Sequence, residues 1–138
     1  MSDPTFTRLF RAARVAMAKA YAPYSRVKVG AALMTSDGHI YTGCNVENAS
    51  YGATICAERT AIVKAASDGH RKIIAILVVT NQREVWPPCG MCRQMLAEFA
   101  GPQTVVYFTN LKKRMKVAHF SALMPGAFTK DFLSSRSR

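Results

Sequence analysis

Helical and strand-like segments alternate through the middle of the chain, and this order constrains the fold more than any other feature. Residues 55–67 have the apolar spacing of a helix, and the Asp68-Gly69 pair after them is a stop signal. Residues 73–80 form a continuous apolar run typical of a buried strand. A helix over residues 90–100 and a strand over residues 104–109 repeat this unit. Two strand-to-strand crossovers through helices predict an α/β sheet with at least some parallel pairing.

The first part of the chain predicts a helix followed by a β-hairpin. Asp3 can cap a helix whose apolar positions recur as far as about Tyr21. Strand-like residues 27–34 and 40–46 flank the turn sequence TSDG. Near the other end, KKRMKVAHF is typical of a basic edge strand, and FSALMPGAF of a short helix that turns into a loop. With 138 residues, 49% of them apolar, we expect one domain over residues 1–138, ending in a disordered basic tail at residues 134–138.

The composition of the chain indicates where the protein is located and which partners it binds. The apolar stretch near the start is broken by Arg14 and Lys19, so we expect neither a signal peptide nor a membrane span, and we expect a cytoplasmic protein. The net charge of +11 favours nonspecific attraction to phosphates. The dense basic run KKRMK carries no aromatic residue that could stack on a base, so we do not expect nucleic acid as a partner.

Four cysteines in a chain without an export signal favour metal or catalytic roles over disulfides. Cys89 and Cys92 form a C-x-x-C at the start of one predicted helix, and Cys56 has the matching place on the helix before it. Helix N-termini stabilise thiolates, so both helices can direct their positive ends at one zinc ion. Three thiolates leave a fourth tetrahedral position open, as in a catalytic zinc site.

Two charged residues follow Cys56 and indicate how such a site would work. Residues two apart on a helix do not face each other, so Glu58 is poorly placed as a ligand beside Cys56. It could instead take the proton of a water molecule at the open position. Three thiolates leave a Zn²⁺ site with an overall negative charge, which weakens its Lewis acidity. Arg59 adjoins Glu58, and we hypothesise that it donates to a thiolate and restores part of that acidity.

Two other interpretations of the cysteines stay open at this point. The CGMC segment is also typical of a redox dithiol, although it follows the third predicted strand, unlike a thioredoxin layout. A closed structural Cys₄ zinc site would need Cys44, but this residue lies in the predicted hairpin, where a small buried thiol is the simpler interpretation. His39, His70 and His119 have no ligand spacing to the cysteines, and we expect structural roles for them.

The segments YAPYS, VGAAL, GCNVENASYG, ICAERTAI, PCGMCRQ and LMPGAF extend over most of the chain. Together they resemble the small homotetrameric zinc-dependent cytidine deaminases, and C-A-E followed by P-C-x-x-C is the three-cysteine variant of a zinc deaminase signature. The resemblance implies a three-layer α-β-α sandwich with a mixed, roughly five-stranded sheet. It implies one zinc ion per subunit, held by Cys56, Cys89 and Cys92, with Glu58 as proton carrier. It further implies deamination of cytidine and deoxycytidine to uridine and deoxyuridine, with release of ammonia, in pyrimidine salvage.

The resemblance also implies the substrate contacts. Asn45 and Glu47 match positions that hold the ribose hydroxyls, for which an amide and a carboxylate offer both donors and acceptors. Ala57 matches another substrate-binding position. Tyr51 and Phe128 match residues that reach the nucleoside of a neighbouring subunit, so a homotetramer with shared sites is implied.

One segment departs from the family pattern. Where the family has a phenylalanine and a proline, YSRVKVG has Val27 and Lys28. A ring against the pyrimidine contributes about 0.5 to 1.5 kcal/mol beyond burial, so we expect weaker cytidine binding. This departure leaves a modified aminonucleoside open as the substrate. Two further alternatives are a deaminase of polynucleotide cytosine and a noncatalytic Cys₄ zinc-stabilised binding module.

Overall fold

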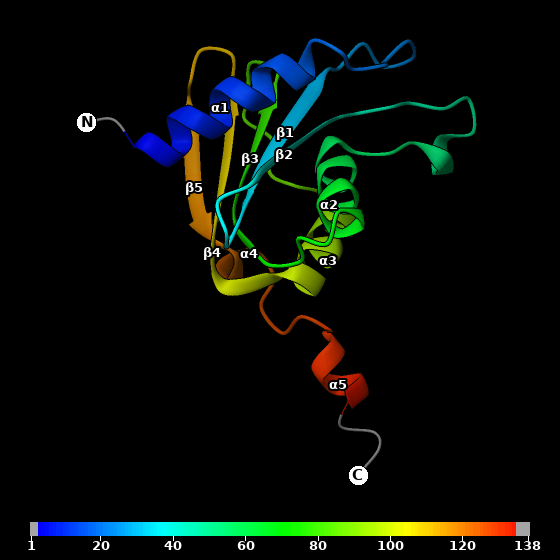
Figure 1. Cartoon of the computed structure of the whole chain (residues 1–138). Helices are drawn as coiled ribbons and strands as arrows, with labels where there is room; N and C mark the ends of the chain where they lie inside the picture. Colours follow the sequence, from blue (N-terminus) through cyan, green and yellow to red (C-terminus); the bar gives the residue numbers. More distant parts are fainter. Residues whose placement is uncertain (1–2, 135–138) are drawn as a thin grey trace.

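A central sheet separates two helical layers (Figure 1). The structure is a computed structural model that describes residues 3–134. Along the chain the elements are α1 (Pro4–Met17), β1 (Val29–Thr35), β2 (Ile40–Cys44), the 3-10 helix η1 (Tyr51–Ala53), α2 (Ala57–Ser67), β3 (Ile73–Thr80), α3 (Gly90–Phe99), β4 (Ala100–Asn110), β5 (Met115–His119), α4 (Phe120–Leu123) and α5 (Lys130–Ser134). One face of the sheet packs against α1, and the other packs against α2 and α3. The predicted three-layer α-β-α arrangement is therefore confirmed.

The sheet is mixed, as predicted, with five strands in the order β2-β1-β3-β4-β5. β1 is antiparallel to both β2 and β3, β3 is parallel to β4, and β4 is antiparallel to β5. β3 lies in the centre with both faces covered, which explains why its sequence is almost continuously apolar. The segment KKRMKVAHF, predicted as a basic edge strand, forms the edge strand β5 only from Met115 to His119, and its first three basic residues lie in the connection before it.

α1 begins where the sequence predicts and ends early. The side chain of Asp3 accepts hydrogen bonds from the backbone N–H groups of Thr5 and Phe6, so it caps the helix. The apolar spacing predicted a helix as far as about Tyr21, but the helix ends at Met17. Tyr21 instead exchanges backbone hydrogen bonds with the segment after β2, donating to the Asn45 carbonyl at 3.0 Å. Pairing with a distant segment has overridden a local helical pattern.

The start of α2 shows the same effect. The sequence predicted a helix from Ile55, yet Ile55 pairs with Val46 through two backbone hydrogen bonds of 2.9 Å, so the helix begins at Ala57. This pairing makes Cys56 the residue that precedes the first helical turn. It also explains why β2 ends at Cys44 while Val46, predicted as its last residue, pairs separately.

A hydrophobic core lies on each face of the sheet, because successive side chains of a strand point to opposite faces. Ala31 and Leu33 of β1 face α2, whereas Ala32 and Met34 face α1. Gly43 of β2 lies directly under the first turns of α2, where a Cβ atom would approach the Ala57 carbonyl oxygen to 2.5 Å. Only a residue without a side chain permits this close approach. The first turns of α2 are therefore held tightly against the sheet.

The C-terminal part leaves the sheet after β5. The predicted short helix is α4, and α5 follows it, set apart from the sheet in Figure 1. The predicted disordered tail begins at Ser134, but Ser134 ends α5, and residues 135–138 lie outside the described residues. No helix within residues 3–134 has the length and apolar character needed to cross a membrane.

Candidate active site

Three cysteine sulfurs converge from the starts of two helices. Cys56 precedes the first turn of α2, Cys89 precedes the first turn of α3, and Cys92 lies within that turn. The Sγ atom of Cys89 lies 3.8 Å from that of Cys56 and 3.3 Å from that of Cys92. A tetrahedral zinc ion with Zn–S bonds of about 2.3 Å holds its sulfurs about 3.8 Å apart. The donor atoms, their number and their spacing therefore fit zinc, as the sequence predicted.

Helix N-termini and one arginine favour negative charge on these sulfurs. The pKa of Cys56 is lowered to about 5, first because Cys92 donates a hydrogen bond to it and also because Arg59 lies beside it. The same contact raises the pKa of Cys92. Zinc binding requires deprotonated sulfurs, so it would release protons from these thiols.

Arg59 is held toward the sulfurs, as hypothesised. Its Nη2 donates to the Thr54 carbonyl oxygen at 2.8 Å and lies 4.0 Å from the Cys56 sulfur. Its Nε atom is buried and has no hydrogen-bond partner among the described residues. A buried guanidinium is stabilised by negative charge nearby, and thiolates supply that charge. The geometry therefore pairs Arg59 with the ligand cluster, whereas its effect on reactivity is a prediction.

Glu58 is the acidic group of the site. It lies in the first turn of α2 and is 5% exposed. Burial raises the pKa of its carboxyl group to about 7, whereas a bound cation would act in the opposite direction. A carboxyl group with a pKa near neutrality can both accept and release a proton, as general acid–base chemistry requires.

A cavity of about 280 Å³ opens beside the sulfurs and Glu58. It is lined by the segment before β1, the segment after β2, the start of α2 and the loop between β3 and α3. Val27, the replacement for the family's aromatic residue, is part of this lining. Trp86 lines the same cavity from the loop before Cys89, and the sequence analysis missed it. A tryptophan three residues before the C-x-x-C could have signalled an alternative aromatic wall.

The residues expected to hold the ribose lie in this cavity together with Ala57. The side-chain amide of Asn45 donates to the Val27 carbonyl at 2.8 Å and accepts from the Val29 N–H at 2.9 Å, so one donor and one acceptor site are left. The Glu47 carboxylate accepts hydrogen bonds from the backbone of Tyr24 and from Ser25. These bonds, chiefly the one from the Ser25 hydroxyl, lower the pKa of Glu47.

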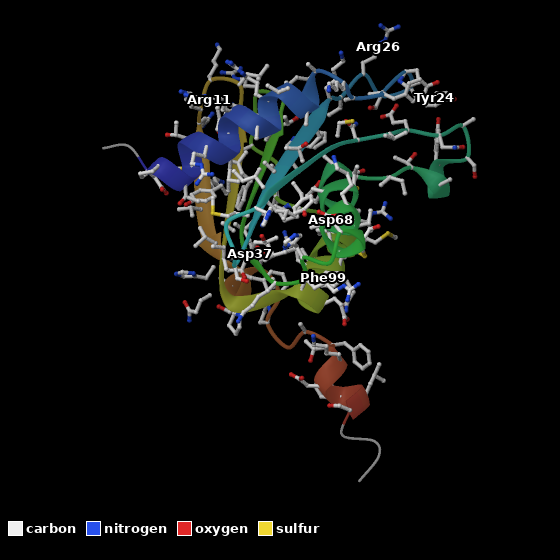
Figure 2. The ribbon with its side chains drawn as sticks, in the orientation of Figure 1. Arg11, Tyr24, Arg26, Asp37, Asp68 and Phe99 are labelled. Atoms are coloured by element: carbon white, nitrogen blue, oxygen red, sulfur yellow. The ribbon has the colours of Figure 1, made fainter. Side chains whose placement is uncertain are left out.

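Tyr51 and Phe128 lie outside this cavity. Tyr51 is 77% exposed and packs edge-on against Tyr24, which Figure 2 labels in the loop before β1. Phe128 is 58% exposed and stacks on Phe132 of α5. Tyr51 instead lines an adjoining cavity, which shares Ser25, Glu47 and Thr54 with this one. The roles of Tyr51 and Phe128 in substrate binding are predictions.

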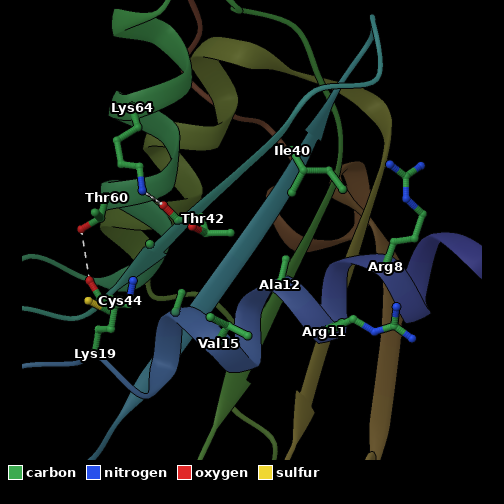
Figure 3. Close-up of a pocket in the computed structure, with 12 residues that line it drawn as sticks. Arg8, Arg11, Ala12, Val15, Lys19, Ile40, Thr42, Cys44, Thr60 and Lys64 are labelled. Carbon is green, nitrogen blue, oxygen red and sulfur yellow. Dashed lines mark hydrogen bonds between the residues drawn. The ribbon is translucent and has the colours of Figure 1, made fainter.

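Cys44 does not belong to the sulfur cluster. Within residues 3–134 the metal-ligand group contains Cys56, Cys89 and Cys92 without it. Cys44 lines a separate cavity between α1, β2 and α2, where Thr60 donates to its carbonyl oxygen (Figure 3). The Cys₄ interpretation therefore has no fourth sulfur among the described residues, and Cys56 and Cys89 line the cavity that also contains Glu58.

Arg93 supports the site and was also missed by the sequence analysis. Its Nε donates to the Pro88 carbonyl oxygen, just before Cys89, and its Nη1 donates to the Leu123 carbonyl oxygen of α4, both at 2.8 Å. The guanidinium therefore fixes the loop that carries Cys89. The signal was present in PCGMCRQ, since an arginine directly after a C-x-x-C can reach back to the preceding turn.

Three cysteine ligands beside a buried carboxyl group, at a cavity sized for a small molecule, define a zinc-dependent deaminase on this α/β fold. Comparison with known proteins gives the same class. The family model of the cytidine and deoxycytidylate deaminase zinc-binding region matches residues 5–109, and the chain belongs to this family.

Individual relatives agree over nearly the whole chain. A cytidine deaminase of Halalkalibacterium halodurans is 52% identical over 112 residues, which cover 81% of this chain and 85% of that protein. A cytidine deaminase of Mycobacterium tuberculosis is 39% identical over 138 residues, with complete coverage of both chains. The crystal structure of cytidine deaminase from Burkholderia pseudomallei has a TM-score of 0.85 at 46% identity, covering 93% of this chain and 100% of that chain.

Proposed function

We propose that the protein hydrolyses cytidine and deoxycytidine to uridine and deoxyuridine, releasing ammonia. The clustering of three cysteine sulfurs beside a cavity that Cys56, Cys89 and the buried Glu58 line carries this conclusion. The cavity volume of about 280 Å³ is at the small end of the range for ligand sites, which suits a nucleoside better than a polynucleotide. The names of the relatives support the same reaction. We place the enzyme in pyrimidine salvage in the cytoplasm.

Each residue at the sulfur end of the cavity has a separate role in this proposal. Cys56, Cys89 and Cys92 hold the zinc ion, and Arg59 offsets part of their negative charge. Zinc with an open fourth position makes water a nucleophile near neutral pH. Glu58 takes one proton from the attacking water and delivers it to N3 of the cytosine, and it then moves the remaining proton of the new C4 hydroxyl group to the leaving amine. A C4–O bond forms, the C4–N4 bond breaks, and both protons of the water are accounted for, one on N3 and one on the ammonia that leaves.

The opposite end of the cavity holds the sugar. Glu47 is fixed by the backbone of Tyr24 and Ser25, and it accepts a hydrogen bond from a ribose hydroxyl. Asn45 uses its remaining donor and acceptor sites for the other hydroxyl. Ala57 lies between Cys56 and Glu58 in the sequence and lines the cavity, and its small side chain leaves room for the base. Val27 and Trp86 contact the pyrimidine ring from the apolar walls.

We infer a homotetramer whose sites are shared between chains. Tyr51 and Phe128 are exposed and lie outside the cavity of their own chain, as expected for residues that complete a neighbour's site. Mixing chains that carry Glu58→Gln with chains that carry Phe128→Ala tests this inference. A shared site restores deamination in the mixed oligomers, because some pockets then combine an intact Glu58 with an intact Phe128. No gain over the separate variants contradicts the sharing.

The reaction is tested by loss of cytosine absorbance with the zinc-loaded protein, together with measurement of bound zinc. We expect turnover of cytidine and deoxycytidine, and Glu58→Gln to lower kcat by about 10²- to 10⁴-fold while zinc stays bound. Glu98→Gln, an exposed carboxylate on α3, is the matched control and leaves kcat unchanged. A zinc-loaded wild-type protein that leaves both nucleosides intact would instead indicate a binding module or a modified aminonucleoside as substrate.

A further inference from the structure

A second group of metal-ligating side chains lies at the other end of α2 from the cysteines. Asp37 and His39 lie at the turn between β1 and β2, and His70 lies in the loop between α2 and β3. Their ligand atoms all lie within 4.8 Å of one another. α2 has 11 residues, so about 17 Å of helix separates this group from Cys56. The group is therefore independent of the site already described.

The two imidazole rings direct the same nitrogen at one carboxylate oxygen. Nδ1 of His39 lies 3.3 Å from Oδ2 of Asp37, and Nδ1 of His70 lies 2.9 Å from the same atom. Imidazole nitrogens and carboxylate oxygens bind zinc at about 2.0 to 2.2 Å, so tetrahedral ligand atoms are about 3.3 to 3.5 Å apart. The first distance fits this spacing, and the second needs a few tenths of an ångström of widening, for which the exposed Asp37 side chain can move.

The surrounding side chains hold these groups through atoms other than the proposed ligand atoms, which pair with one another. The Thr35 hydroxyl donates to Oδ1 of Asp37 at 2.5 Å, so Oδ2 is the carboxylate oxygen that faces the two imidazoles. That hydrogen bond is the main reason why the pKa of Asp37 is lowered to about 2, so the carboxylate is charged at neutral pH. On the far side of the His70 ring, Nε2 lies 4.0 Å from Oδ2 of Asp68, to which the Tyr41 hydroxyl donates.

The His70–Asp68 contact is longer than a hydrogen bond, but it pairs the same groups as the second contact of many metal-binding histidines. A histidine ligand usually faces a carboxylate or a carbonyl oxygen with its other nitrogen, and this partner fixes the ring. Figure 2 labels Asp37, which lies at the β1–β2 turn, and Asp68, which follows the last turn of α2. The β1–β2 turn and the α2–β3 loop are also joined through their backbones, since the N–H of Ser36 donates to the Lys72 carbonyl oxygen at 2.9 Å.

We propose that Asp37, His39 and His70 form a second binding site, for a divalent transition-metal ion of the zinc type. Two imidazoles and one carboxylate are a ligand set that suits zinc, nickel and copper and discriminates against magnesium and calcium. The exposed Asp37 and His39 give the ion access from solvent. The bound ion joins the β1–β2 turn to the α2–β3 loop, so it stabilises the hairpin without contacting the catalytic cavity.

The site is tested by titration of the zinc-loaded enzyme with Zn²⁺ in a calorimeter, after removal of unbound metal. We expect a further equivalent of zinc per chain. Asp37→Asn and His39→Gln each lower the affinity for this additional zinc ion by at least about tenfold, and neither changes the deamination rate. His119→Gln is the matched control, because His119 is exposed and bonded to the Gln103 carbonyl oxygen, outside the group. Both tested side chains are exposed, so the variants fold.

Cobalt distinguishes this site from adventitious binding at a thiol such as Cys44. The second equivalent of Co²⁺ is expected to give visible absorption without the thiolate charge-transfer band that marks the cysteine site. A wild-type protein that takes up no second equivalent overturns the proposal. So does a second equivalent that survives in both Asp37→Asn and His39→Gln, or one whose cobalt form shows the thiolate band.

Discussion

Gly43→Ala is the change that most directly couples the fold to the active site. Gly43 lies in β2 under the first two turns of α2, and a Cβ atom there would approach the Ala57 carbonyl oxygen to 2.5 Å and the Ala61 nitrogen to 2.6 Å. Both are backbone atoms, so no side-chain rotation relieves the contact. Ordinary van der Waals contact begins at 3.4 Å, so the start of α2 must move away from the sheet by about 0.9 Å.

The displaced segment carries catalytic groups. Cys56 and Glu58 flank Ala57, so a shift of the helix start moves a zinc ligand away from Cys89 and moves the proton carrier relative to the substrate. A misplacement of about 1 Å can lower a rate by about 10²-fold. Overpacking of a filled core lowers stability by about 1 to 3 kcal/mol. We therefore expect a large loss of kcat/KM with a moderate loss of stability.

The measurements are kcat/KM for cytidine, bound zinc per chain and the melting temperature. Gly101→Ala is the control, because no heavy atom lies within 4 Å of the position that its Cβ would occupy and its backbone needs no positive φ. It should match the wild type in activity and zinc content. A folded Gly43→Ala protein with wild-type kcat/KM and full zinc would refute the reasoning, since it would show that the helix start tolerates the added methyl group.

Three further predictions follow from single contacts. Val27→Phe should raise kcat/KM for cytidine about two- to twelvefold by adding a ring to the cavity wall, and Trp86→Ala should lower it; no change in either variant would exclude stacking there. Arg59→Gln should lower the rate and shift its pH profile, and an unchanged rate and profile would remove Arg59 from the mechanism. The Tyr107 hydroxyl donates to Asp3 at 2.7 Å and lowers the pKa of Asp3 below its ordinary value of 3.8. The pair therefore stabilises the folded state above pH 3.8, and this stabilisation is lost as the pH falls through the lowered pKa. Melting temperatures should therefore show a weaker acid dependence for Tyr107→Phe than for the wild type, and parallel curves would contradict the assignment.

Much of the fold was predictable because it depends on local patterns. The apolar run of β3 was assigned its observed bounds, since a central strand is covered on both faces and is apolar at almost every position. Boundaries were wrong where a segment pairs with a distant partner. Tyr21 was predicted to be helical and Ile55 to open α2, but both form backbone hydrogen bonds with the segment after β2. Such pairing depends on residues far away in the sequence, which periodicity does not report.

The residues of the candidate site also divide into those that local sequence patterns predict and those that only tertiary contacts bring together. The sequence by itself determined the candidate metal ligands, because Cys56, Cys89 and Cys92 occupy helix starts, and a C-x-x-C brings two sulfurs together through local geometry alone. Only the tertiary structure decided that Trp86 enters the cavity, that Cys44 stays outside the sulfur cluster, and that His70 meets the β1–β2 turn. Contacts within one helical turn are set by the helix itself, whereas these contacts exist only after sheet pairing has brought separate loops together.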